Sequence, residues 1–254
     1  MPDSSRPKIL VFASGTASGG GSGFENLVRH SRESNGDLKA DIVGVVSNHK
    51  NGGVALHASA LSIPFFYFPV PHFPISKSQQ NYSNILKNIR IEKNAEEPKP
   101  NAKTYQAIAE KSGAEWFALS GWMKRIEGLD PARTFNIHPA LLSLLGGRFG
   151  GEGMYGGHVH HAVREALEKG EIQESGVSMH FVTDEYDRGP VFFEFRVPLM
   201  RGMSAEEIQE KVNKAEHQFQ PKITNMVVNG DISWNGKDPA TLKVPDGYRY
   251  LPRA

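Results

Sequence analysis

The sequence contains no cysteine among its 254 residues, so disulfide bonds and thiolate chemistry are excluded. It also lacks an excess of charge of either sign, because 29 basic and 28 acidic residues leave a net charge of +1. A nearly neutral chain has no long-range field that would gather nucleic acid or an anionic membrane. We therefore expect small-molecule partners and no nucleic acid, and any anionic ligand must be held by local groups.

Long apolar runs are missing as well. No run approaches the roughly 20 residues that a membrane-spanning helix needs, and the N-terminal segment lacks the apolar core of a signal peptide. Together with the absence of cysteine, this pattern predicts a cytoplasmic protein without a membrane partner. The hydrophobic content of 39% is sufficient for one core, so we expect a single domain over residues 1–254.

Short apolar segments alternate with segments of helical spacing along the first half of the chain. The expected strands are Lys8–Ala13, Asp41–Ser47, Ile63–Phe68, Glu115–Ser120 and Thr134–His138. The expected helices are 24–32, Val54–Leu61 and Thr104–Lys111. This alternation is typical of an α/β fold in which helices flank a mostly parallel, twisted sheet.

The second half of the chain has a different pattern. Ser178–Val182 and Pro190–Pro198 alternate apolar and polar residues, which predicts a C-terminal antiparallel excursion of the sheet. Helices are expected at Ala162–Lys169 and Ala205–Val228. Two further stretches, the polar Ile75–Lys103 and the Gly- and His-rich 146–161, are expected to be loops.

A glycine-rich loop, SGTASGGGSG, lies between the first strand and the first helix. Glycines let the backbone approach a ligand closely, and free N–H groups at a helix start favour an anion. The loop does not fit the dinucleotide fingerprint, because Phe24 stands where a third glycine belongs. It is not a nucleotide P-loop either, because no Gly-Lys-Ser/Thr follows. A single phosphate group is therefore the expected ligand; a simple surface loop is the alternative.

Asn136 and His138 alternate on an expected strand, so their side chains point to the same side. An amide donor and an imidazolium could stabilise an oxyanion, although such a pair in isolation is more often a structural hydrogen-bonded pair. An aspartate from the acidic turn that follows His180 would have to reach the His138 ring to raise its pKa and favour the cation. His158, His160 and His161 suggest a metal site, but no cysteine or second cluster accompanies them, and we expect no metal.

Five segments together resemble the glycinamide ribonucleotide transformylase family of folate-dependent formyltransferases: SGTASGGGSGFENL, LSGWMKRI, FNIHPALL, GVSMHFVTDEYDRGPV and KAEHQF. The resemblance implies a formyltransferase-like, Rossmann-related fold. It implies transfer of a formyl group from 10-formyltetrahydrofolate, as co-substrate, to the amine of glycinamide ribonucleotide in de novo purine synthesis. The residues that match the family's catalytic trio are Asn136, His138 and Asp187.

The same resemblance assigns binding residues. The substrate phosphate is expected at Gly21, Ser22 and Gly23, and the amino-bearing arm at Glu216. The folate site is expected at Trp122, Met123, Lys124, Arg125, Ile126, Val182 and Asp184. Gly23 stands where the family usually has Asn, so we expect the phosphate to be held more by backbone N–H groups.

Three other functions remain open. A hydrolase could use the same trio to release the formyl group as formate, and a formyltransferase could act on another small amine. A catalytically silent folate- or nucleotide-binding module is the third, but it predicts a degraded trio, whereas all three residues are present.

Overall fold

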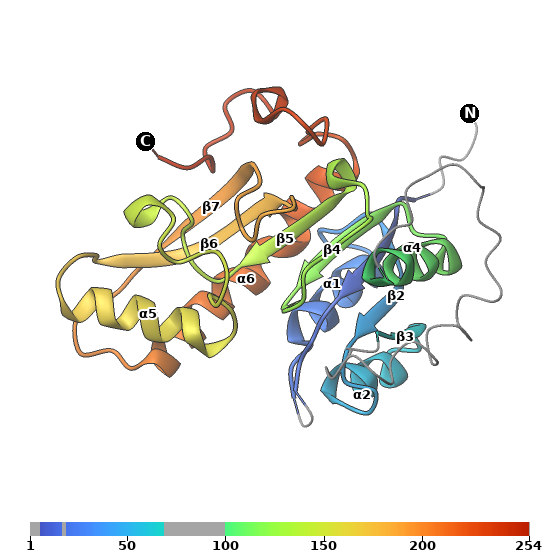
Figure 1. The fold of residues 1–254 in the computed structure, drawn as a ribbon, viewed down its shortest axis with the longest axis horizontal. Coiled ribbons are helices and arrows are strands. Elements are labelled where there is room, and N and C mark those ends of the chain that lie inside the picture. The colour runs from blue at the N-terminus through green and yellow to red at the C-terminus, as the bar shows by residue number, and fades with distance from the viewer. Residues whose placement is uncertain (1–5, 17–18, 69–99, 254) are drawn as a thin grey trace.

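The computed structural model describes residues 6–16, 19–68 and 100–253. In these residues, seven strands form one sheet in the order β3-β2-β1-β4-β5-β6-β7 (Figure 1). The strands β1 to β5 are parallel, while β5, β6 and β7 pair antiparallel, which confirms the expected sheet. Their bounds are β1 (Lys8–Phe12), β2 (Asp41–Ser47), β3 (Phe65–Tyr67), β4 (Trp116–Ser120), β5 (Thr134–His138), β6 (Glu174–Phe181) and β7 (Val191–Pro198).

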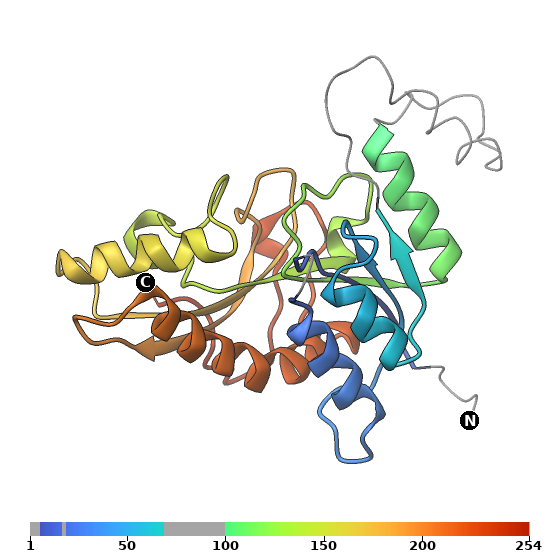
Figure 2. The ribbon, with the colours of Figure 1, turned by 90° about the horizontal axis from the view of Figure 1, so that it is seen from below.

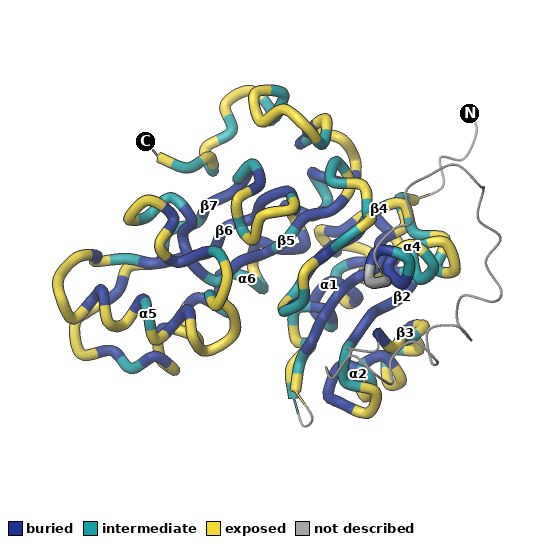
Figure 3. The backbone as a smooth tube through the Cα atoms, viewed as in Figure 1, coloured by how far each residue is buried: buried dark blue, intermediate teal, exposed yellow. Residues whose placement is uncertain are grey.

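Helices cover both faces of the sheet. Their bounds are α1 (Ser22–Arg32), α2 (Gly53–Ala60), α4 (Pro100–Ser112), α5 (Gly157–Glu168) and α6 (Ala205–Val228), with short 3-10 turns at Pro131–Arg133, Leu144–Gly146 and Pro239–Thr241. Because strand side chains alternate, Ile9 and Val11 enter the larger core with α1, α2, α5 and α6. Leu10 and Phe12 enter a smaller core under α4, on the opposite face (Figure 2). Apart from the edge strand β3, the strands are buried along most of their length, and many exposed residues lie in the loops (Figure 3). No helix in the described part of the chain is long and apolar enough to cross a membrane.

Several expected boundaries were wrong. β3 is short because the Ile63 N–H bonds to the Ala58 carbonyl at 2.9 Å, which makes this residue part of the turn that ends α2. β6 begins at Glu174, since it pairs with β7 along its whole length. α4 already begins at Pro100, inside the stretch expected to be a loop; residues 75–99 of that stretch lie outside the described residues.

The predicted start of α5, at Ala162, was also wrong. The helix begins at Gly157, so His158, His160 and His161 lie on a helix and not in a loop. The apolar spacing contained this signal, because the buried Val159 lies four residues before the buried Val163.

The sheet topology determines where ligands can bind. β1 lies between β2 and β4, so the chain leaves β1 toward β2 and β3 and then returns to the other side of β1 as β4. The connections at the carboxyl ends of β1 and β4 therefore run in opposite directions. Such a switch point opens a crevice outside the carboxyl ends of the strands.

Beside this crevice, a proline in α6 leads to a hydrogen bond between α1 and α6. Pro221 lies inside α6 and has no N–H, so the His217 carbonyl one turn earlier loses its helical donor. The buried Asn26 of α1 replaces it, because its Nδ2 donates to the His217 oxygen at 2.8 Å. This contact fixes the first turns of α1 against the middle of α6.

We expect Asn26→Ala to lower the free energy of unfolding by roughly 1–3 kcal/mol, since the His217 carbonyl would be left without a donor. Pro221→Ala restores an N–H at position 221, so the same Asn26→Ala change should cost clearly less in that background. Chemical denaturation of the four proteins of this cycle measures the coupling. Equal costs in both backgrounds would show that the amide does not serve this carbonyl.

Candidate active site

A cavity of about 690 Å³ lies at the carboxyl ends of the strands. Its walls come from the loops after β1, β4 and β5, from the turn between β6 and β7, and from α6. The cavity brings together most of the residues selected from the sequence: Gly21, Ser22, Gly23, Trp122, Met123, Lys124, Arg125, Asn136, His138, Asp187 and Glu216.

The remaining three expected folate residues line a second cavity, of about 440 Å³. They are Ile126, Val182 and Asp184. The two cavities border the same two chain segments, because Arg125 and Asp187 line the first while Ile126 and Asp184 line the second. The expected folate site is thus divided between two adjoining hollows.

Asp187 lines the first cavity. Its Oδ2 accepts from the Gly151 N–H at 2.9 Å, and its Oδ1 lies 3.4 Å from Asn136 Nδ2 and 3.3 Å from His180 Nε2. Its backbone adopts φ 53, a left-handed conformation that costs energy in a residue other than glycine. Burial raises the pKa of Asp187, but the His180 hydrogen bond, the nearby imidazoles and the Gly151 N–H together lower it to about 2. The carboxylate is therefore ionised at neutral pH.

His138 differs from the expectation that its ring is a cation. The buried ring lies between two acceptors: Nε2 is 2.6 Å from the Phe149 carbonyl and Nδ1 is 3.7 Å from Asp187 Oδ2. Since a carbonyl only accepts, Nε2 carries a proton. Burial lowers the pKa of His138, and this effect exceeds the opposing influence of Asp187. The ring is therefore neutral in the unliganded protein at neutral pH.

His180 is a site residue that the sequence reasoning did not select. It faces Asn136 across the β5–β6 pair, with 3.1 Å between its Nε2 and Asn136 Nδ2. Its Nδ1 donates to the Phe181 carbonyl at 2.9 Å, so Nε2 accepts from Asn136 when the ring is neutral and donates to Asp187 when it is charged. The alternation of β6 contained this signal, but the partner strand was unknown.

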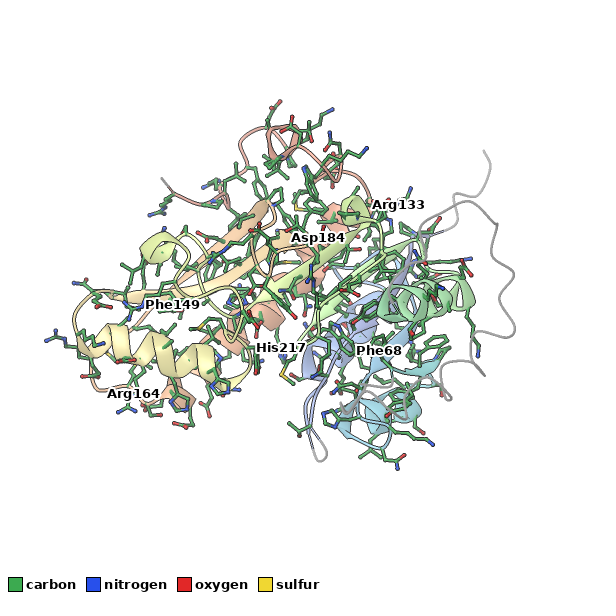
Figure 4. All side chains as sticks on the ribbon, in the orientation of Figure 1. Phe68, Arg133, Phe149, Arg164, Asp184 and His217 are labelled. Atoms are coloured by element: carbon green, nitrogen blue, oxygen red, sulfur yellow. The ribbon has the colours of Figure 1, made fainter. Side chains whose placement is uncertain are left out.

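The glycine-rich loop ends at the N-terminus of α1. Gly21 precedes the helix with φ 94, a conformation that favours glycine, and no side chain caps the helix start. The first N–H groups of α1 thus remain available at the cavity wall. His217 reaches this turn from α6, with its Nε2 3.2 Å from Ser22 Oγ (Figure 4).

The segment after β4 is anchored by an aromatic cluster in the smaller core. The Trp122 Nε1–H donates to the Tyr105 hydroxyl at 3.1 Å, and that hydroxyl donates to the Arg125 carbonyl at 2.9 Å. Phe12 and Phe68 pack against both rings. The segment that separates the two cavities is therefore anchored in the smaller core.

Glu216 projects from α6 into the first cavity, where it is half-buried. Burial raises the pKa of Glu216 to about 7, while a hydrogen bond with Asn213 acts in the opposite direction. Two of the carboxyl groups that line the cavity therefore differ, since the pKa of Asp187 is lowered to about 2 and that of Glu216 is raised to about 7.

The histidines of α5 do not gather into a metal site. Among the described residues, no group of three or more His, Cys, Asp or Glu side chains could hold a metal ion. His160 lines the first cavity, and burial lowers its pKa to about 4. The metal-free chemistry expected from the sequence stays a prediction.

The fold and this arrangement define an α/β protein with an amide, imidazoles and carboxylates gathered at a switch-point cavity. A family model described as formyl transferase matches residues 7–224. The chain therefore belongs to the formyl transferase family.

Curated relatives and a solved structure agree with this membership. The chain is 31% identical over 233 residues to the phosphoribosylglycinamide formyltransferase, chloroplastic, of Arabidopsis thaliana, covering 90% of this chain and 68% of that protein. The phosphoribosylglycinamide formyltransferase of Bacillus subtilis is 27% identical over 228 residues, covering 87% of this chain and 94% of that protein. The crystal structure of the Brucella melitensis enzyme of that name matches with a TM-score of 0.64 at 26% identity, covering 88% and 96% of the two chains. The chain spans about two thirds of the length of its plant relatives.

The raised pKa of Glu216 predicts how stability depends on pH. Between pH about 4.5 and about 7 the folded protein keeps a proton that the unfolded chain has lost, so stability falls as pH rises through this window. Glu216→Gln removes this pH-dependent loss of stability, because a glutamine side chain does not titrate. At pH 8 the variant should be more stable than the parent by roughly 2–3 kcal/mol, and at pH 4.5 the two should be similar.

Denaturation of both proteins at the two pH values measures this effect. Glu210→Gln, which changes an exposed residue of the same helix, is the matched control and should show no such pH dependence. A parent protein as stable as Glu216→Gln at pH 8 would show that the ionised Glu216 side chain does not destabilise the folded protein.

Proposed function

We propose that this chain transfers the formyl group of 10-formyltetrahydrofolate to the amine of glycinamide ribonucleotide. The observation that carries the proposal is the composition of the first cavity. The uncapped start of α1, the expected folate-binding segment Trp122–Arg125 and the trio Asn136, His138 and Asp187 all line it. Relatives named phosphoribosylglycinamide formyltransferase support the same reaction.

The ribonucleotide occupies the side of the cavity formed by α1 and α6. Its phosphate binds the N–H groups at Gly21, Ser22 and Gly23, because a helix N-terminus favours an anion. Its amino-bearing arm then lies toward Glu216. An α-amino group has an ordinary pKa near 8, so a carboxyl with a pKa of about 7 is suited to hold the ammonium and to accept its proton.

Folate occupies the other side. Its bicyclic ring fits the second cavity, between the segment Ile126–Leu129 and the turn Val182–Glu185. Its formyl-bearing nitrogen then lies in the first cavity, beside Arg125 and Asp187. This division explains why the folate residues expected from the resemblance line two hollows.

The chemistry follows from the charges that the reaction creates. The neutral amine attacks the formyl carbon, and the new C–N bond places negative charge on the formyl oxygen and positive charge on the attacking nitrogen. Asn136 donates to the oxyanion, and His138 supplies a second donor once the developing charge draws it from Phe149. Asp187 stabilises the positive nitrogen, a role that suits a carboxylate with a pKa of about 2. The C–N bond to folate then breaks, and one proton passes from the attacking nitrogen to the folate nitrogen.

The cellular compartment stays a prediction. The sequence pattern favours the cytoplasm, whereas the plant relatives are named as chloroplastic. Small molecules remain the expected partners, because the near-neutral charge gives no surface for a phosphate backbone.

A single assay separates the proposed transferase from the hydrolase. The protein is incubated with 10-formyltetrahydrofolate and glycinamide ribonucleotide while folate absorbance is followed, and the amine is then omitted. We expect turnover only with both substrates. Turnover of equal rate without the amine would identify a hydrolase. Turnover with another small amine, but not with glycinamide ribonucleotide, would show that the proposed acceptor is wrong.

The trio should act as one unit. Asp187→Asn should lower turnover by roughly 100–1000-fold while both substrates still bind, because it removes the charge that stabilises the attacking nitrogen. The double change His138→Ala with Asp187→Asn should cost much less than the product of the single losses, as is usual for groups that work together. A fully multiplicative loss would mean that the two residues act independently. An Asp187→Asn enzyme within a few-fold of normal would remove this carboxylate from the mechanism.

A further inference from the structure

Gly23, in the first turn of α1, faces two polar side chains from other elements. A Cβ placed on Gly23 would lie 2.3 Å from the Oγ of Ser120, at the end of β4, and 3.2 Å from the Oε1 of Gln220 on α6. The shorter separation is one that real Cβ atoms essentially never show. The room that a side chain at position 23 would need is thus taken by a hydroxyl and an amide that reach over the helix start.

Neither of these polar groups has a hydrogen-bond partner in the part of the chain that the structure describes. Gln220 is 2% exposed, yet its side-chain amide forms no hydrogen bond with any described residue. Ser120 is only partly buried, and its hydroxyl likewise has no described partner. Buried polar groups in native proteins are normally hydrogen-bonded, and leaving one unpaired is costly. Both residues line the first cavity, so a ligand in that cavity can supply the missing partner.

The surroundings determine the chemistry of that ligand. The N–H groups of the first turn of α1 have no side-chain cap, and their partial positive charge favours an anion. Glu25, the acidic residue in this turn, lies 3.2 Å from His57 of α2. The hydroxyl and the amide add neutral donors in fixed positions, which suits the several oxygens of a phosphate monoester.

We propose that Ser120 and Gln220 bind the phosphate of the ribonucleotide. Their polar groups occupy the space that a side chain at position 23 would otherwise fill. This assignment rests on the proposed function and adds two specificity-determining residues to it. The phosphate oxygens accept from the Ser120 hydroxyl, from the Gln220 amide and from the N–H groups of α1. Position 23 must then be glycine, because any Cβ displaces the Ser120 hydroxyl.

The test uses the full chain and two probes, inorganic phosphate and glycinamide ribonucleotide. Ser120→Ala and Gln220→Met should each weaken binding of both probes about tenfold, while kcat and the KM for 10-formyltetrahydrofolate change less than about twofold. Gln218→Met alters an exposed residue of the same helix and is the matched control, with no expected effect. Gly23→Ala should weaken both probes to a similar extent, and adding Ser120→Ala to it should add little.

The outcomes separate this proposal from the proposed function. Formyl transfer by the parent together with normal phosphate and ribonucleotide binding by Ser120→Ala and Gln220→Met would overturn the proposal and leave the function intact. If the parent shows no formyl transfer but its binding of inorganic phosphate still depends on Gln220, the proposed function is wrong and the phosphate site stands. If Gln220→Met does not fold, Ser120→Ala and Gly23→Ala decide the question by the same measurements.

Discussion

The carboxylate of Asp187 is the contact on which the rest of the site depends. It lies on the turn between β6 and β7 but accepts from the Gly151 N–H, and it contacts Asn136 and His180 on neighbouring strands. These donors hold the ionised form and compensate for the left-handed backbone at Asp187. Without this anion, the segment that contains Gly151, the strand β6 and the strand β5 would have no common partner at the cavity wall.

A second set of constraints acts on the other wall. Pro221 deprives α6 of one helical hydrogen bond, and Asn26 of α1 supplies the replacement. The open start of α1 is therefore positioned against the residues of α6 that face the cavity. The same wall carries a Glu216 carboxyl with a pKa of about 7 and a Gln220 amide that has no hydrogen-bond partner among the described residues. Such groups reduce stability so that they can meet a ligand, as functional sites commonly do.

Much of the fold was predictable because its signals are local. Apolar runs identified the strands from Lys8 to His138, and alternation identified the antiparallel pair, since side-chain periodicity follows directly from backbone geometry. The boundaries that failed depend on tertiary contacts. Ile63 is drawn into a helix-ending turn, and β6 is extended by its pairing with β7. The parallel sheet also places the loops after β1 and β4 side by side, so the location of the cavity followed from topology alone.

By itself, the sequence determined the order of the elements, the absence of cysteine chemistry, and the segments that carry Asn136, His138 and Asp187. Only the tertiary structure decided how these groups behave. Burial lowers the pKa of His138, where the sequence pattern suggested a cation, and strand pairing adds His180 to the site. The meeting of Gly23 with Ser120 and Gln220, residues from three separate elements, is likewise invisible in the sequence. The physical reason is that pKa values and hydrogen-bond partners depend on distance and desolvation, which only the folded chain defines.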